Sequence, residues 1–142
     1  TLLIGYGGAA VAIHYVLKKK GFKNITIINR TKKKLRYEKK TTYTINLSRL
    51  TDYLADSDLI INSTPTNPID KKNIKLVSPK AILSDIVYKP KETQFLKSFP
   101  ENKKIYGIYM LLEQAVPCFE MWLGFKPTID DRLIKILDKK IT

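Results

Sequence analysis

Short apolar runs alternate with longer amphipathic segments along this chain, and the alternation predicts its secondary structure. The apolar runs predict strands at 2–4, 24–29, 42–46, 58–62, 81–86 and 104–106. The segments between and after them predict helices at 9–20, 32–38, 48–56, 93–99, 108–122 and 128–139. Strands that alternate with helices indicate an α/β fold, with a mostly parallel sheet and helices on both faces. The length favours a single domain, residues 1–142.

The first strand runs into a glycine-rich turn, Gly5-Tyr6-Gly7-Gly8-Ala9-Ala10, which opens the first helix. Gly5 permits a tight turn, Gly7 lets the backbone approach a pyrophosphate, and a small residue at Ala10 lets the helix pack on the strand. An anion would then bind the free N–H groups at the positive end of the helix. This context predicts a Rossmann-type, doubly wound sheet that binds a dinucleotide. The alternative is an ordinary strand-to-helix turn that tolerates glycine.

The end of the second strand indicates which dinucleotide binds. NAD sites place an Asp or Glu there for the ribose 2′-hydroxyl, but this chain has Asn29, Arg30 and Thr31, and no carboxylate before Glu38. Arg30 and Lys34 suit a 2′-phosphate, which an acid would repel. Thr31 is also a plausible N-cap for the helix at 32–38, where an anionic ligand would relieve the conflict between cations and the helix dipole. These residues favour NADP over NAD, against the alternative of a solvated basic helix start.

The spacing of apolar residues predicts which face of each of two helices is buried. The stripe Ala9, Ala12, Ile13, Val16 and Leu17 predicts the buried face of the first helix, with His14 facing away. In the helix at 108–122, one stripe predicts core packing: Ile108, Leu111, Leu112, Ala115, Phe119 and Trp122. The opposite side holds Met110, Gln114, Pro117 and Met121, which indicates a surface for a partner, against the alternative of a solvated face.

The net charge of +13 invites a nucleic-acid interpretation. We do not favour one, because the cations are mostly scattered lysines rather than arginine forks interleaved with aromatic rings. Cys118 is the only cysteine, so there is no disulfide framework or zinc cluster, which fits a reducing compartment. There is no apolar run long enough for a membrane span and no signal-peptide pattern. The chain starts at its first strand, which predicts a piece of a larger protein.

Several motifs together resemble one family. They are Gly5-x-Gly-Gly-Ala-Ala, Asn29-Arg-Thr, Asp58-Leu-Ile-Ile-Asn-Ser-Thr, Asp85-Ile-Val-Tyr-Lys-Pro-Lys-Glu-Thr, Gly107-Ile-Tyr-Met-Leu-Leu-Glu-Gln-Ala and Phe119-Glu-x-Trp-x-Gly. Over essentially its whole length, the chain resembles the C-terminal NADP-binding domain of shikimate dehydrogenase. The first two motifs also occur in other dehydrogenases and in glutamyl-tRNA reductase, whereas the motifs at Asp85 and Gly107 are more specific.

The resemblance implies a cytoplasmic oxidoreductase that reduces 3-dehydroshikimate to shikimate with NADPH, in chorismate and aromatic amino-acid biosynthesis. It implies that Gly5, Tyr6, Gly7, Gly8 and Ala9 hold the pyrophosphate, and that Asn29, Arg30, Thr31 and Lys34 hold the 2′-phosphate. Thr64 and Ile86 would line the cofactor site, Gly107 would approach the nicotinamide, and Tyr88 and Gln114 would reach the substrate. The family's catalytic lysine and aspartate lie in an N-terminal substrate domain, so no catalytic residue and no metal ligand is expected here.

Two departures from the family pattern concern the cofactor site. Tyr6 replaces a small residue, so that its ring is expected to crowd or stack near the cofactor, and Asn67-Pro68 stands where Gly-Met is usual. Three alternatives stay open: an NAD-dependent quinate/shikimate dehydrogenase, a glutamyl-tRNA reductase-like domain, and a basic nucleic-acid-binding module. The expected partners are the substrate and the N-terminal domain, without nucleic acid or membrane, and a homodimer is also allowed.

Overall fold

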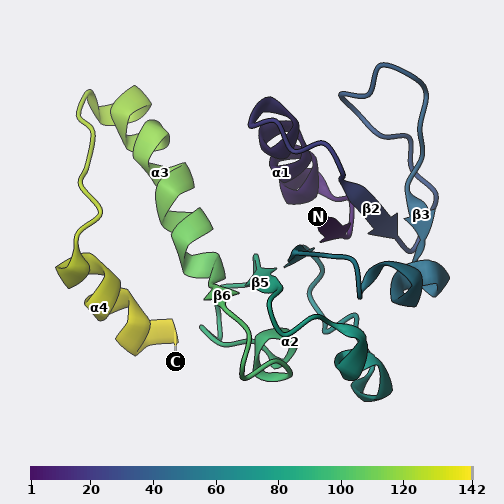
Figure 1. Cartoon of the computed structure of the whole chain (residues 1–142). Helices are drawn as coiled ribbons and strands as arrows, with labels where there is room; N and C mark the ends of the chain where they lie inside the picture. The colour runs from purple at the N-terminus through teal and green to yellow at the C-terminus, as the bar shows by residue number, and fades with distance from the viewer. Residues whose placement is uncertain (142) are drawn as a thin grey trace.

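The computed structural model describes residues 1–141, so of the expected domain 1–142 only Thr142 lies outside the described residues. The described residues contain a parallel sheet whose strands lie side by side in the order β3-β2-β1-β4-β5-β6 (Figure 1). The strands are β1 (Leu2–Ile4), β2 (Thr26–Asn29), β3 (Ile45–Asn46), β4 (Leu59–Asn62), β5 (Ile82–Asp85) and β6 (Lys104–Ile105). From β1, the chain adds β2 and β3 on one side and then returns to add β4, β5 and β6 on the other side, which is the doubly wound arrangement. The predicted Rossmann-type α/β fold is confirmed.

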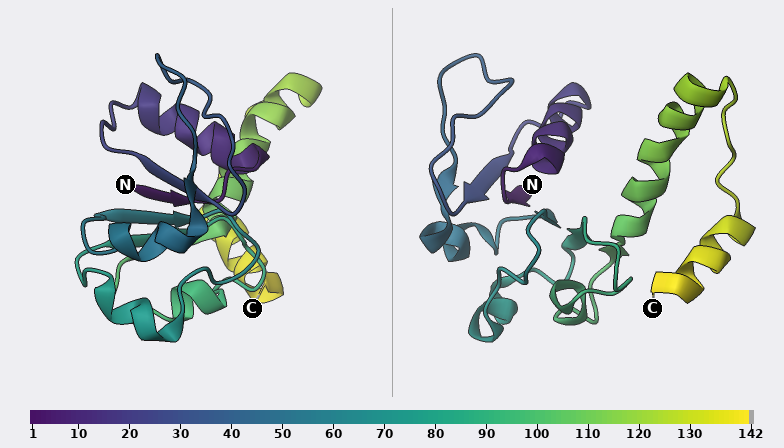
Figure 2. Two further views of the ribbon diagram at one scale, coloured as in Figure 1. Left: turned by 90° about the vertical axis from the view of Figure 1, so that its right-hand side faces the viewer. Right: turned by 180° about the vertical axis from the view of Figure 1, so that it is seen from behind.

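Helical segments cover both faces of the sheet (Figure 2). On one face α1 (Gly8–Lys19) packs on a core that includes Leu3, Ile27 and Ile61. The other face carries the 3-10 helices η1 (Leu47–Tyr53) and η2 (Lys71–Leu76) and the short α2 (Gln94–Lys97). Their core cluster includes Leu2, Ile4 and Ile60. Successive residues of β1 therefore point to opposite faces and supply both cores.

The buried face of α1 differs from the predicted stripe. Its buried residues are Ala10, His14 and Leu17, spaced by four and three residues, whereas Ala12 and Val16 are exposed. The prediction of an outward-facing His14 was wrong, since this side chain is fully buried. A polar ring can occupy the core face because it is hydrogen-bonded there. Gly21 has φ +85, the left-handed conformation expected just after a helix.

Residues 31–44 form a loop without a helix, and we call them the basic loop. The predicted helix at 32–38 was wrong, and β3 is shorter than the predicted strand at 42–46. The loop folds back on itself through an antiparallel bridge between Lys34 and Tyr43. Leu35 N–H donates to Thr42 O at 2.8 Å, and Thr44 N–H donates to Lys33 O at 2.8 Å. These cross-loop bonds replace the i→i−4 bonds of a helix, so the helix-dipole argument for an anion at Thr31 no longer applies.

Two helices extend from the β6 edge of the sheet, α3 (Gly107–Leu123) and α4 (Asp131–Ile141) (Figure 1). The predicted core stripe of α3 was largely wrong: Ile108 is buried, but Phe119 is 42% and Trp122 74% exposed. The buried residues of α3 are confined to its first turn, at Gly107 and Ile108, next to the two-residue strand β6. Further along, α3 packs against the α4 segment around an apolar hollow of about 240 Å³. The hollow is lined by Leu112, Ala115, Val116, Phe119, Pro127, Thr128, Ile129 and Leu133.

Of the helices formed by residues 1–141, none combines the length and apolarity that crossing a bilayer requires.

Candidate functional site

The glycine turn between β1 and α1 begins at a position that only glycine fits. Gly5 has φ +95, and a Cβ there would lie 2.5 Å from Ser63 Oγ. The Ser63 hydroxyl donates to Ile4 O at 2.7 Å, so the loop after β4 closes against the turn. Gly5 N–H donates to Ile28 O at 2.8 Å, which ties the turn to β2. Ala10, 1% exposed, packs α1 onto the sheet.

The next two glycines face open space. A Cβ added at Gly7 or Gly8 would meet nothing within 4 Å. Gly7 is the N-cap of α1 in an extended conformation, without a side-chain cap, and the first turn holds no acid. The first N–H groups of the helix therefore point into accessible space as hydrogen-bond donors. This cradle, which side chains would fill, fits the pyrophosphate of a dinucleotide.

A hollow of about 390 Å³ lies beside this turn. Its lining residues are Tyr6, Gly7, Gly8, Val11, Lys33, Lys34 and Arg36. The three charged side chains among them are all cations, and they come from the basic loop. Lys33 Nζ donates to Tyr6 O at 3.1 Å, which joins the loop directly to the turn. Three cations beside a helix N-terminus, with no carboxylate in the lining, favour a multiply charged phosphate ligand.

A second hollow of about 330 Å³ lies where β1, β2 and β4 end. Its lining residues are Ile4, Gly5, Ile28, Asn29, Arg30, Leu47, Thr64, Pro65 and Thr66. Buried Asn62 holds the loop after β4, because its amide donates to Thr66 O at 3.0 Å and its Oδ1 accepts from Thr64 Oγ1 at 2.7 Å. Aliphatic walls, with the exposed Arg30 in the lining, suit a base and ribose. Ligands of doubly wound sheets bind at such strand ends.

The structure brings most of the expected cofactor residues to these two hollows. The first is lined by Tyr6, Gly7, Gly8 and Lys34, and the second by Gly5, Asn29, Arg30 and Thr64. Ala9 is the next residue of α1. Thr31 lines neither hollow; its carbonyl accepts from Asn29 Nδ2 at 2.7 Å and so orients that side chain.

The expected nicotinamide and substrate residues lie elsewhere along the strand ends. Gly107 begins α3, and a Cβ there would lie 2.5 Å from Ile86 O, so this close approach requires glycine. Tyr88 is 41% exposed and Gln114 is exposed on α3, and neither lines the two hollows. Their roles stay predictions.

Asp85, at the end of β5, is buried in a hydrogen-bond network. Its carboxylate accepts from Thr93 Oγ1 at 2.6 Å, from Asn62 Nδ2 at 3.2 Å and from Val87 N–H at 3.0 Å. Thr93 also caps α2, accepting from Leu96 N–H at 3.3 Å. The network joins the loops that follow β4 and β5, which gives this buried carboxylate a structural role. Among residues 1–141, no group of three or more His, Cys, Asp or Glu is arranged to hold a metal ion.

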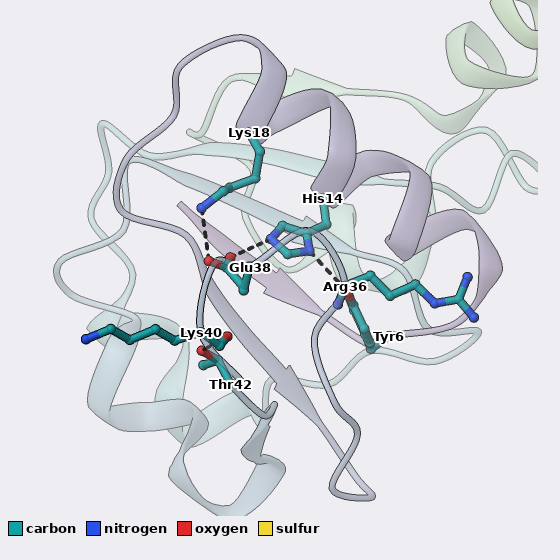
Figure 3. Close-up of polar contacts among 7 residues, drawn as sticks. All are labelled: Tyr6, His14, Lys18, Arg36, Glu38, Lys40 and Thr42. Atoms are coloured by element: carbon teal, nitrogen blue, oxygen red, sulfur yellow. Dashed lines mark hydrogen bonds and ion pairs between the residues drawn. The ribbon is translucent and has the colours of Figure 1, made fainter.

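The Tyr6 ring points into the core although Tyr6 also lines the hollow beside the turn, and the expected crowding or stacking against a cofactor stays a prediction. The Tyr6 side chain is 4% exposed and turns inward, where Oη lies 3.1 Å from His14 Nδ1 (Figure 3). His14 Nε2 lies 3.2 Å from Glu38 Oε1. Burial lowers the pKa of His14 more than the neighbouring Glu38 raises it, so the ring is neutral at pH 7. The ring is therefore held by hydrogen bonds rather than by its charge.

Sequence reasoning missed two cations of the site, Lys33 and Arg36. The lysine run from Lys32 to Lys34 was a visible signal for the first. Arg36 gave no usable signal, because no sequence pattern relates residue 36 to the glycine turn 30 residues earlier. Only the folded-back loop brings its side chain there.

Comparison with known proteins agrees with this geometry. The model of the family described as shikimate / quinate 5-dehydrogenase matches residues 1–90. The shikimate dehydrogenase (NADP(+)) of Bartonella quintana is 35% identical in an alignment of 154 residues, gaps included, that covers 97% of this chain and 53% of that protein. The corresponding protein of Rhizobium meliloti is 30% identical, over 96% of this chain and 51% of its own length. The chain thus spans about half the length of the curated relatives it matches.

Solved structures give the same result. The chorismate mutase/shikimate 5-dehydrogenase fusion protein from Clostridium acetobutylicum is 32% identical, with a TM-score of 0.75, over 99% of this chain and 53% of that one. Quinate dehydrogenase from Corynebacterium glutamicum, solved with NAD, has a TM-score of 0.76 over 96% of this chain and 54% of that one. It is 19% identical, so it supports the fold alone. The family match covers 90 of 142 residues and contains the whole lining of both hollows. On these grounds, the chain belongs to the shikimate/quinate 5-dehydrogenase family.

Proposed function

We propose that this chain is the NADP-binding domain of a shikimate dehydrogenase. In this role it holds NADPH while 3-dehydroshikimate is reduced to shikimate, a step of chorismate and aromatic amino-acid biosynthesis in the cytoplasm. The observation that carries the proposal is the hollow beside the glycine turn, where the charged lining residues are Lys33, Lys34 and Arg36. A site for NAD would instead offer an acid to the ribose 2′-hydroxyl. The relatives from Bartonella quintana and Rhizobium meliloti are both named as NADP(+) enzymes.

The residues of the two hollows bind different parts of the cofactor. Gly7, Gly8 and the N-terminus of α1 hold the pyrophosphate, and the adenosine lies in the hollow bounded by Asn29 and Thr64. Arg30 in the lining of that hollow, together with Lys34, holds the 2′-phosphate, with Thr31 orienting Asn29. Bound NADPH supplies the hydride. The domain contributes orientation of the cofactor and exclusion of water.

The remaining chemistry belongs to a substrate domain that carries the proton donor. Gly107 and Ile86 bring the start of α3 close to the end of β5, where the nicotinamide is expected. Tyr88 and Gln114 face the substrate across the contact with that domain, and both side chains are exposed and available for it. The chain by itself should therefore bind NADP(H) and turn over no shikimate.

Calorimetric titration of the chain with NADP⁺ and with NAD⁺ tests the proposal. We expect tighter binding of NADP⁺, and expect Arg30→Asp to weaken NADP⁺ binding about a hundredfold while NAD⁺ binding stays within about threefold. Losing one charge-assisted contact and adding a repulsive charge costs about 3 kcal/mol. Arg132→Asp is the matched control, since Arg132 is exposed on α4, away from both hollows. Tighter binding of NAD⁺ would favour the NAD-dependent quinate/shikimate enzyme.

The basic nucleic-acid module is tested in the same preparation. It predicts salt-dependent binding of RNA or DNA that excess NADP⁺ does not diminish. We expect NADP⁺ to compete with any such binding, because both ligands would occupy the cations beside the glycine turn. Polyanion binding that persists at saturating NADP⁺ would contradict the proposal that these cations serve the cofactor.

A further inference from the structure

A network of polar side chains links Tyr6 and α1 to the basic loop (Figure 3). Tyr6 Oη accepts the backbone N–H of Arg36 at 2.9 Å and lies 3.1 Å from His14 Nδ1. On the far side of the ring, His14 Nε2 lies 3.2 Å from Glu38 Oε1, and Lys18 Nζ donates to Glu38 Oε2 at 3.1 Å. Tyr6 and His14 are 4% and 0% exposed. The Tyr6–His14 part of the network is therefore shielded from water, where hydrogen bonds are strongest and unpaired groups most costly, whereas the Glu38–Lys18 pair at its far end is partly exposed.

The donor and acceptor of each hydrogen bond in this network can be assigned consistently. Tyr6 Oη accepts from Arg36, so its own hydrogen is free to donate to His14 Nδ1. His14 then carries its proton on Nε2 and donates it to the Glu38 carboxylate, which is the role of a neutral imidazole. Each group has a partner without any charge on the ring.

Besides the ladder between residues 33–35 and 42–44 and the packing of the Tyr37 ring against Tyr15 and His14, this network fixes the basic loop to α1 and to the glycine turn. Of the loop's cations, Lys33 also reaches Tyr6, donating from Nζ to the backbone oxygen at 3.1 Å. Leu35 is the apolar residue of the loop that packs on the core under α1. The Arg36 side chain leads from the network toward the N-terminal turn of α1, and it lines the hollow there (Figure 3). Tyr6 thus fixes the loop backbone at Arg36, and His14 fixes the loop at Glu38, close to the cations Lys33, Lys34 and Arg36.

We propose, resting on the NADP-binding function above, that Tyr6 and His14 are positioning residues that give this domain its preference for NADP over NAD. They hold the basic loop against the glycine turn, so that its cations face the phosphate that distinguishes the two cofactors. NAD lacks that phosphate and gains little from the loop. Loosening the loop therefore lowers the affinity for NADP selectively, whereas damage to the fold would lower both affinities.

Tyr6→Phe tests this by removing one hydroxyl while keeping the ring in the core. We expect the Kd for NADP⁺ to rise about tenfold and the Kd for NAD⁺ to change by less than about twofold, measured by calorimetry. Tyr53→Phe is the matched control: it makes the same deletion on the opposite face of the sheet, and should leave both constants unchanged. Thermal melts of each variant establish that it is folded at the assay temperature.

A second experiment separates positioning from general support. In the triple variant Lys33→Ala, Lys34→Ala, Arg36→Ala, the cations are gone but the backbone N–H that Tyr6 accepts is still present. Adding Tyr6→Phe to it should then have no further effect on the ratio of the two Kd values. Should Tyr6→Phe not fold, His14→Phe breaks the same network while keeping a ring, and we expect the same selective loss.

The outcomes are distinct. An unchanged Kd ratio in Tyr6→Phe or His14→Phe, in a chain that still prefers NADP⁺, would overturn the positioning role alone. Equal weakening of both cofactors would also overturn it, and would make Tyr6 a purely structural residue. If the unaltered chain binds neither dinucleotide, the proposed function itself fails.

Discussion

Replacing Gly5 and Gly7 by alanine should separate the two uses of glycine in this turn. At Gly5, φ +95 disfavours an L residue, which costs about 1–2 kcal/mol. The added Cβ would also lie 2.5 Å from Ser63 Oγ. Moving that hydroxyl breaks its bond to Ile4 O, at a cost of about 1 kcal/mol. We therefore expect Gly5→Ala to lower the free energy of unfolding by about 2–3 kcal/mol.

Gly7→Ala should weaken dinucleotide binding while leaving the stability of the fold nearly unchanged. The backbone there is extended (φ −88, ψ −169), which any residue adopts, and the Cβ would meet nothing within 4 Å. Exchanging glycine for alanine at an N-cap costs well under about 1 kcal/mol, so stability should barely change. The methyl group would occupy the space over the helix N-terminus, and we expect at least a tenfold weaker Kd for both NADP⁺ and NAD⁺.

Urea denaturation and calorimetric titration of the two variants measure these effects. With m near 1–3 kcal/mol/M, the Gly5→Ala change corresponds to a midpoint about 1 M lower. Unaltered dinucleotide binding in Gly7→Ala would refute the placement of the pyrophosphate on the turn. A Gly5→Ala variant as stable as the original chain would refute the packing argument.

Three further predictions concern stability. Thr93→Val removes both the bond to Asp85 and the cap of α2, and should lower the free energy of unfolding in urea by about 2 kcal/mol. Because burial lowers the pKa of His14 in the folded chain, the unfolded chain binds more protons below about pH 6.5. The melting temperature should accordingly fall as the pH drops from 7 to 5, and fall less in His14→Gln; equal slopes would contradict the pKa argument. Trp122→Ala, at a 74% exposed site, should cost less than about 1 kcal/mol, against about 2–5 kcal/mol for Leu54→Ala in the core. A large loss at Trp122 would contradict the position of α3.

The sequence by itself determined the succession of the six strands along the chain, the glycine turn and the ends of the strands where the site lies. These features are local: an apolar run of three or four residues identifies a buried strand, and Gly5 stands where φ must be positive. Their signals are complete within a few neighbouring residues. The motifs at Asp85 and Gly107 likewise indicated the family without tertiary information, and the family model matches residues 1–90.

The tertiary structure alone decided the basic loop, the orientation of α1 and the packing of α3. The loop folds back because residues 30 and 24 positions apart meet, in the Tyr6–Arg36 and His14–Glu38 contacts, and no local pattern records such pairs. The same contacts make His14 a core residue despite its polarity. The stripe on α3 is apolar, but the sheet ends at the short β6, so Phe119 faces the α4 segment instead. Periodicity shows which side chains avoid water, whereas only the fold determines what covers them.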